Sequence, residues 1–91
     1  MNLMIPEITI EECAEVIQAI TKIQRFGMEN SGYNNKEKLE EEIGQLKYML
    51  ERLALYWSLD YYNMTVAAGK KHNALYEYAK YNTCNKDLAG T

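Results

Sequence analysis

Two short acidic segments carry the residues whose types and spacing are best suited to chemistry. They are EECAE at residues 11–15 and EEEIGQ at residues 40–45. On a helix, side chains three or four positions apart lie on one face, so Glu12 would neighbour Glu15, and Glu42 would neighbour Gln45. Two antiparallel helices with such faces could direct their oxygen atoms at one hard cation. Mg²⁺ prefers oxygen ligands in octahedral geometry and retains several waters.

Each segment also has a simpler interpretation. Thr9 and Glu12 have the spacing of a capping box, and the glutamates of residues 11–15 would then lie in a first helical turn whose dipole favours anions. In the second segment, Glu42 lies within reach of Lys38 on a helix that could simply be exposed. Taken alone, each segment therefore fits a solvated acidic helix.

The two segments together predict a metal site more specifically than either does alone. The carboxylates of Glu12, Glu15 and Glu42 would hold one magnesium ion, a substrate triphosphate would complete its coordination, and an activated water could attack phosphorus. Gly44 supports a ligand nearby, because a glycine inside a helix costs about 1 kcal/mol relative to alanine. Close approach of another backbone or of a ligand would explain why it is there.

Glu11-Glu12-x-x-Glu15 followed by Glu42-x-x-Gln45 resembles the EExxE and ExxD signature of the all-α, MazG-like nucleoside triphosphate pyrophosphohydrolases. The resemblance covers about Ile10 to Leu53 and is to small family members, many of them from bacteriophages. It implies a helical fold that forms homodimers or homotetramers. It also implies magnesium-dependent cleavage of a nucleoside triphosphate to a monophosphate and pyrophosphate.

The resemblance assigns roles by position. Glu12, Glu15 and Glu42 match the magnesium ligands of the family, and Glu11 matches a further acidic residue of the catalytic motif. Gln45 stands where the family has aspartate, and it can offer a metal only one neutral carbonyl oxygen. A nucleotide-binding relative with little or no turnover is therefore the alternative to an enzyme.

Basic and aromatic residues are the candidates for substrate contacts. Lys22 lies two helical turns after Glu15, and Arg25 follows it, so either could meet phosphate oxygens. The remaining candidates are Lys70 and Lys71, across a subunit interface, and Trp57, for stacking on a base. All of these residue types are also common as surface cations or as apolar anchors.

Hydrophobic periodicity predicts three helices, from about Thr9 to Phe26, from about Lys36 to Trp57, and from a cap at Ser58 or Asp60 to about Tyr81. No segment has the pattern of a strand, and Gly27–Asn35 is predicted to be a loop. The fold class is all-α, a single domain with an antiparallel bundle of about three helices completed by homo-oligomerisation. Residues 1–8 would be an N-terminal extension, and residues 82–91 a flexible tail.

The composition narrows the possible functions. The chain has 91 residues and a formal net charge of −3, which argues against a protein that binds the backbone of a nucleic acid polymer. Two cysteines at unrelated positions predict neither a disulfide framework nor a zinc site. No signal segment or membrane-spanning run is visible, so the expected location is the cytoplasm, or the host cytoplasm for a phage protein.

Three functions remain open. The first is a magnesium-dependent nucleoside triphosphate pyrophosphohydrolase, for which the acidic residues argue. The second is a MazG-like protein that sequesters a nucleotide or nucleotide signal without cleaving it, for which Gln45 argues. The third is a helical oligomer that binds another protein, for which the broad apolar surface of a short chain argues.

Overall fold

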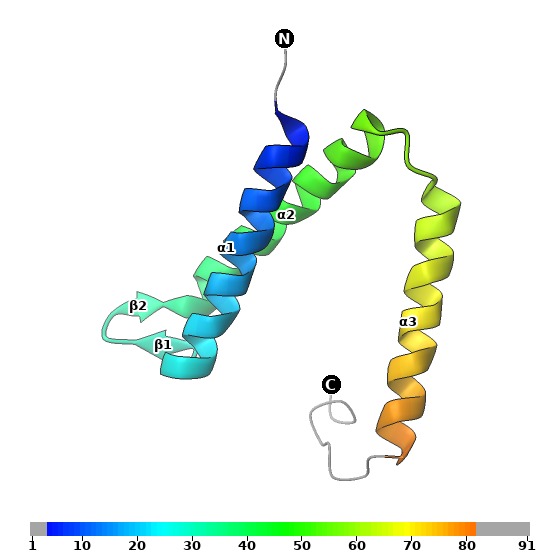
Figure 1. The fold of residues 1–91 in the computed structure, drawn as a ribbon. Helices are drawn as coiled ribbons and strands as arrows, with labels where there is room; N and C mark the ends of the chain where they lie inside the picture. The colour runs from blue at the N-terminus through cyan, green and yellow to red at the C-terminus, as the bar shows by residue number, and fades with distance from the viewer. Residues whose placement is uncertain (1–3, 82–91) are drawn as a thin grey trace. The chain divides into compact units, whose positions relative to one another are not determined.

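The computed structural model describes residues 4–81, which form three long helices and one very short β-hairpin (Figure 1). The helices are α1 (Ile5–Phe26), α2 (Asn35–Tyr56) and α3 (Tyr61–Tyr81), and the strands are β1 (Glu29–Asn30) and β2 (Tyr33–Asn34). The all-α class is confirmed. The tail predicted at residues 82–91 and the first three residues lie outside the described part of the chain.

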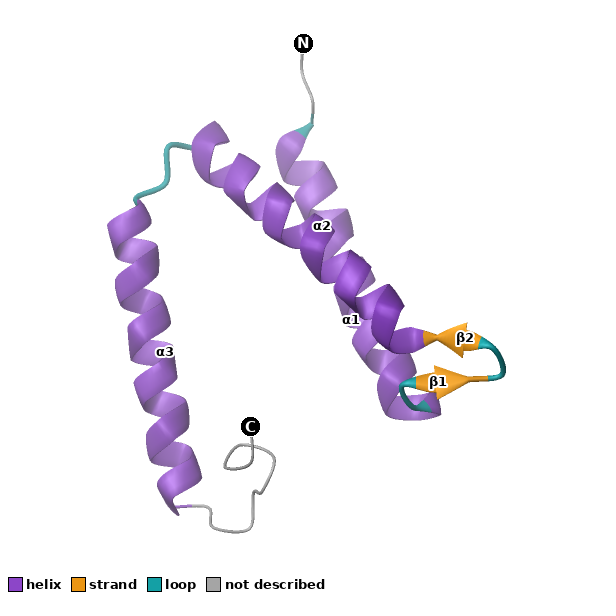
Figure 2. Cartoon of the chain, turned by 180° about the vertical axis from the view of Figure 1, so that it is seen from behind, coloured by secondary structure: helices purple, strands orange, loops and turns teal. Residues whose placement is uncertain are grey.

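The chain divides into two units, Met1–Leu59 and Asp60–Thr91. In the first unit, α1 and α2 lie side by side and antiparallel, and the β-hairpin joins them at one end (Figures 1 and 2). The second unit contains α3. No helix within residues 4–81 combines the length and the apolar character that crossing a bilayer requires.

Helix α1 begins at Ile5, earlier than the start predicted at Thr9. Pro6 lies in the first turn, where its missing N–H leaves no helical hydrogen bond unmade. The predicted capping box is therefore wrong, and the predicted N-terminal extension is helical from Ile5 onward. Thr9 instead lies inside the helix, where its hydroxyl donates to the carbonyl oxygen of Ile5 at 2.8 Å. The glutamates that follow consequently lie beyond the first turn, outside the range of the favourable helix dipole.

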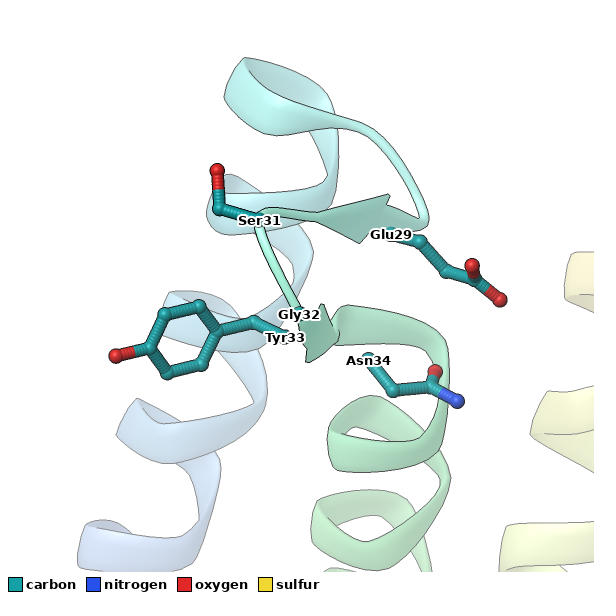
Figure 3. A pocket seen from close by; sticks show the side chains of 5 residues that line it. All are labelled: Glu29, Ser31, Gly32, Tyr33 and Asn34. Atoms are coloured by element: carbon teal, nitrogen blue, oxygen red, sulfur yellow. The ribbon is translucent and has the colours of Figure 1, made fainter.

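The segment predicted to be a loop, residues 27–35, contains the antiparallel pairing of β1 with β2, so the prediction of no strand is corrected. Ser31 and Gly32 both have positive φ, 50° and 86°, and this two-residue turn geometry matches the twist of a hairpin. Figure 3 shows the paired residues Glu29 and Asn34 on the same side of the hairpin. The short hairpin fixes how far α2 is displaced along α1.

Side-chain caps begin both later helices. The Asn34 Oδ1 accepts a hydrogen bond of 2.9 Å from the backbone N–H of Glu37, which satisfies one free donor of α2. The Asp60 Oδ1 accepts one of 2.8 Å from the N–H of Tyr62 at the start of α3. Of the two caps considered for α3, Asp60 is therefore the one used.

The core between α1 and α2 is small. The buried side chains of the first unit are Ile5, Thr9, Ala19, Glu42 and Met49. A second set of apolar side chains on α1 is exposed in the described chain, with Ile10 at 69% and Ile17 at 64%. Helix α1 therefore carries two apolar stripes, and α2 covers only one of them.

Candidate metal centre

The facing stripes of α1 and α2 each include a carboxylate. The less exposed positions of α1 are Ile5, Pro6, Ile8, Thr9, Glu12, Val16, Ala19 and Ile23. Those of α2 are Asn35, Leu39, Glu42, Leu46, Met49, Arg52, Leu53 and Ala54. Spacings of three and four along both helices direct these residues at the partner helix. Such a glutamate loses water on folding, so its charge needs a compensating partner.

Three carboxylates from the two helices meet at this interface. One oxygen from each of Glu12, Glu15 and Glu42 lies within 4.8 Å of the other two. Two oxygens bound to one Mg²⁺ are separated by at most about 4.2 Å, twice the usual metal–oxygen distance. The observed cluster is therefore only slightly larger than a metal site. The three oxygens would have to move closer together, by small side-chain rotations, to bind one ion. We call Glu12, Glu15 and Glu42 the acidic trio.

The trio is buried to different degrees. Glu42 is only 2% exposed, Glu12 is half-buried and Glu15 is exposed at the edge. The Oε2 atoms of both Glu12 and Glu42 are buried without a hydrogen-bond partner within the described chain. Buried acceptors of this kind are rare in folded proteins, because each unpaired group costs about 1–3 kcal/mol in lost hydration. A cation shared by both oxygens would replace the lost hydration.

Lys38 provides the compensating charge within the chain. Its Nζ lies 2.9 Å from Oε1 of Glu42 and 3.8 Å from Oε2 of Glu41. The ion pair neutralises one oxygen of the buried Glu42 and leaves its other oxygen without a partner within the described chain. The sequence alone indicates only an ordinary surface contact for Lys38, whereas its partner is the most buried carboxylate of the site.

The contacts of Glu15 and Glu42 with each other and with Lys38 shift the pKa values of these two carboxyls in opposite directions. A hydrogen bond from protonated Glu15 to Glu42 raises the pKa of Glu15, and repulsion from ionised Glu42 and Glu12 raises it further. The Lys38 hydrogen bond, followed by the one with Glu15, lowers the pKa of Glu42. The same contact with Glu42 raises the pKa of Lys38. Within the trio, Glu15 therefore holds its proton more tightly than Glu42 does.

An open hollow of about 490 Å³ adjoins the trio at Glu12. Its lining continues along α2 through Glu40, Glu41, Gly44, Gln45, Tyr48 and Met49. Gln45 is exposed in this hollow, beside the trio. A Cβ atom added at Gly44 would meet no atom within 4 Å, so neither α1 nor the rest of α2 requires a glycine there. Of the two explanations considered for Gly44, close approach of another backbone is therefore not found among the described residues.

A second hollow, of about 430 Å³, lies at the N-terminal end of α2 and is lined in part by basic side chains. It is lined by Lys22, Tyr33, Asn34, Asn35, Glu37, Lys38 and Glu41. Lys22 and Lys38 come from different helices, and Glu41 lines both hollows. The trio is thus flanked by one hollow that contains an aromatic ring and a glycine, and by another that contains two lysines.

The other predicted site residues lie elsewhere. Glu11 is exposed on α1 and is not part of the trio, and the Arg25 guanidinium lies over the Phe26 ring, 5.2 Å from its centroid. Trp57 is exposed at the end of α2, with its ring centroid 6.3 Å from that of Tyr56. Lys70 and Lys71 are exposed on α3, in the second unit.

Sequence reasoning missed two residues that the structure adds to the site. Tyr48 is one of many tyrosines in the sequence, although it lies one helical turn after Gly44 and therefore on the same face. Tyr33 lies in the segment predicted to be a loop, and the hairpin turn brings it to the lysine hollow. A signal for Tyr48 was present in the spacing, whereas Tyr33 depended on the β-hairpin.

No family model matches this chain, and no significant match was found among curated proteins or among solved structures.

Proposed function

We propose that this protein is a magnesium-dependent nucleoside triphosphate pyrophosphohydrolase of the MazG-like type. The observation that carries the proposal is the buried Glu42, which has one oxygen without a hydrogen-bond partner and one oxygen within 4.8 Å of an oxygen of both Glu12 and Glu15. A solvated acidic helix face would leave these carboxylates apart and hydrated. Their convergence from two helices instead concentrates negative charge where only a cation could offset it.

The donor set fits magnesium. All three side chains of the trio offer hard oxygen atoms, and the exposed edge at Glu15 leaves room for waters or for phosphate oxygens. When bound, Mg²⁺ would neutralise charge on the phosphates and activate a water for attack on phosphorus. Glu12 and Glu42 would fix the ion from the buried side, whereas Glu15 would give up its proton on binding.

The two lysines supply charge for the phosphates. Lys22 and Lys38 line the hollow that begins beside Glu41 and Glu42, and each can donate several hydrogen bonds to phosphate oxygens. Lys38 is paired with Glu42 within the described chain. With a cation bound at the trio, Lys38 would be available to donate hydrogen bonds to a phosphate group.

The alternative is a MazG-like protein that binds a nucleotide without cleaving it. Gln45 favours this alternative, because it is exposed in the neighbouring hollow and brings no negative charge to the trio. The metal would then rest on three carboxylates, and a ligand could bind without a strongly activated water. The same hollows serve both functions, so only turnover separates them.

Measurement of pyrophosphate release tests the enzyme directly. Purified protein with Mg²⁺ is incubated with a panel of canonical and modified nucleoside triphosphates, and the Glu42→Gln variant is assayed beside it. We expect turnover by the wild type and at least about a hundredfold loss in the variant, because removal of a charge-stabilising group typically costs that much. Glu51→Gln, on an exposed position of the same helix, should retain activity.

Two results would redirect the proposal. Tight binding of a nucleotide with no pyrophosphate release by the wild type, and turnover gained in Gln45→Asp, would establish the sequestering alternative. No protection of the folded protein by Mg²⁺ or Mn²⁺, with or without nucleotides, would refute both and leave the helical oligomer that binds another protein.

We further propose that the chain functions as a homodimer or homotetramer with a MazG-like bundle. The second stripe of α1 is uncovered, and large apolar side chains on α2 are exposed as well; the residues are Ile10, Ile17, Ile20, Ile43, Leu50 and Leu55. Small domains bury too little apolar surface to be very stable alone. A second copy would cover these side chains with a matching surface.

A further inference from the structure

We propose that the hollow lined by Gly44, Gln45 and Tyr48 receives the nucleoside part of the nucleotide, and that Gln45 contacts its base. We call it the nucleoside hollow. The inference rests on the proposed function, because the phosphates must already be held by the trio. It gives the bound nucleotide a direction, with its base on the C-terminal side of Glu42 along α2 and its terminal phosphates toward the lysines.

The position of the nucleoside hollow supports this direction. It shares Glu12 with the trio, and its lining runs along α2 from Glu40 and Glu41 through Gly44 to Met49, so most of its length lies on the C-terminal side of Glu42. Its volume of about 490 Å³ lies in the range of ligand pockets, about 300–1,000 Å³. The opposite hollow contains both lysines and suits phosphates better than an uncharged base.

The lining side chains have the chemistry that a nucleobase needs. Tyr48 is 60% exposed, so its ring is available to stack on a base. Gln45 offers an amide with one acceptor and two donors, the combination that pairs with the polar edge of a base. An aspartate at position 45 could only accept hydrogen bonds and would repel the nearby phosphates. The departure from the ExxD pattern therefore has a use outside the metal site.

Gly44 provides the clearance. A side chain at this position would project into open space, with no protein atom within 4 Å of its Cβ. Alanine would make α2 more stable, since glycine is the poorer helix former. The packing of α1 on α2 does not explain the glycine. A planar group lying across the helix between Gln45 and Tyr48 would explain it, because such a group would occupy the space of a side chain at position 44.

A larger side chain at position 44 should fill the hollow and weaken binding of the nucleoside without weakening binding of the phosphates. The Gly44→Leu variant is titrated by calorimetry with three probes, which are Mn²⁺ alone, inorganic triphosphate with Mg²⁺, and a panel of α,β-imido nucleoside triphosphates with Mg²⁺. We expect unchanged affinity for Mn²⁺ and for inorganic triphosphate, and at least tenfold weaker binding of the nucleotides. Gly69→Leu, at the other open glycine of the described helices, is the matched control and should bind all probes as the wild type does.

A second variant keeps the test decisive if Gly44→Leu folds poorly. Gln45→Ala should bind inorganic triphosphate normally and should lose the preference among bases that the wild type shows. Equal binding of nucleotides by the wild type and both variants would overturn the nucleoside hollow and leave the metal site intact. A change in subunit number in Gly44→Leu, with inorganic triphosphate weakened as well, would also overturn it and identify the hollow as an interface between copies.

The proposed function fails in a different way. If wild-type protein bound neither Mn²⁺ nor inorganic triphosphate, the trio itself would not be a metal site. The nucleoside hollow would then fail with it, because its ligand is anchored there.

Discussion

Glu42 is the most deeply buried carboxylate of the site. It is a carboxylate in a position of α2 where Leu39, Leu46 and Met49 are the neighbouring stripe residues, and it is the least exposed of all the described side chains. Its Oε1 pairs with the Lys38 ammonium, whereas its Oε2 is buried without a hydrogen-bond partner within the described chain. A leucine at this position would pack more favourably, so stability alone does not account for the glutamate.

Protons and metal ions should compete for the trio. The raised pKa of Glu15 means that the folded protein holds this proton more tightly than the unfolded chain does. Its contribution to stability is therefore full below the ordinary value of 4.5 and is lost as pH rises through the raised pKa. The lowered pKa of Glu42 acts in the opposite sense, with stability present above 4.5 and lost as pH falls through its lowered value.

Because the metal must displace the Glu15 proton, we expect Mn²⁺ affinity to increase as pH rises above 4.5 through the raised pKa of Glu15. Calorimetric titration at a series of pH values measures this dependence. In Glu15→Gln the increase over the same window should be reduced, since the group that releases the proton is gone. An equally steep increase in that variant would show that another residue carries the proton.

Lys38 should oppose the metal and assist the phosphates. In Lys38→Met, we expect Mn²⁺ alone to bind about two- to fivefold more tightly, because a cation 2.9 Å from Glu42 no longer repels it and exposed charge pairs have effects of this size. Inorganic triphosphate in the presence of Mg²⁺ should bind more weakly, since one donor to the phosphates is lost. Lys47→Met, exposed on the same helix, should change neither affinity.

At the scale of elements, the site depends on the register between α1 and α2. The turn at Ser31 and Gly32 keeps the connection short, and the carbonyl of Met28 accepts hydrogen bonds from the backbone N–H groups of Asn35 and Lys36 at 2.8 and 3.1 Å. These contacts tie the hairpin to the start of α2. A shift of one residue along α2 would rotate Glu42 by about 100° away from the trio.

The Asn34 cap should therefore contribute to both folding and metal binding. We expect Asn34→Ala to lower the free energy of unfolding by about 1 kcal/mol, as is usual for loss of an N-cap. Denaturant titration measures this loss, and Mn²⁺ affinity should fall only if the first turn of α2 also loosens. Asn63→Ala, an exposed change inside α3, is the control and should leave α2 unaffected. Unchanged stability in Asn34→Ala would contradict the capping role that the 2.9 Å hydrogen bond indicates.

At the scale of the whole molecule, large apolar side chains remain exposed on both helices of the first unit. They include Ile10, Ile17 and Ile20 on α1 and Ile43, Leu50 and Leu55 on α2. Helix α2 covers only the stripe of α1 that contains Glu12. A second copy of the chain would cover the other stripe, as the proposed oligomer requires.

We expect Ile17→Glu to dissociate the proposed oligomer, because a charge would replace an apolar side chain in the middle of the exposed stripe. Light scattering after size-exclusion chromatography measures the mass of both proteins. Gln18→Glu adds the same charge at the neighbouring exposed position and should preserve the mass of the wild type. A wild-type protein that elutes as a monomer at all concentrations would refute the oligomer.

Local signals in the sequence determined the helices and much of the candidate site. The approximate bounds of α2 and α3, and a cap for α3 at either Ser58 or Asp60, follow from residues within a few positions of each other, and the structure selects Asp60. The acidic trio was also predicted, because i and i+3 spacing on two helices leaves few other ways to bring Glu12, Glu15 and Glu42 together.

Only the tertiary structure decided which face of α1 packs on α2 and where that helix begins. Both stripes of α1 are apolar, so periodicity could not choose between them, and the choice depends on how α2 fits against each one. With α1 packed on α2 in this way, Thr9 lies inside α1 and not at its cap, Glu42 is buried, and Gln45 lines the hollow. These features depend on distances between residues thirty to forty positions apart in the chain, which local patterns of about four residues do not encode.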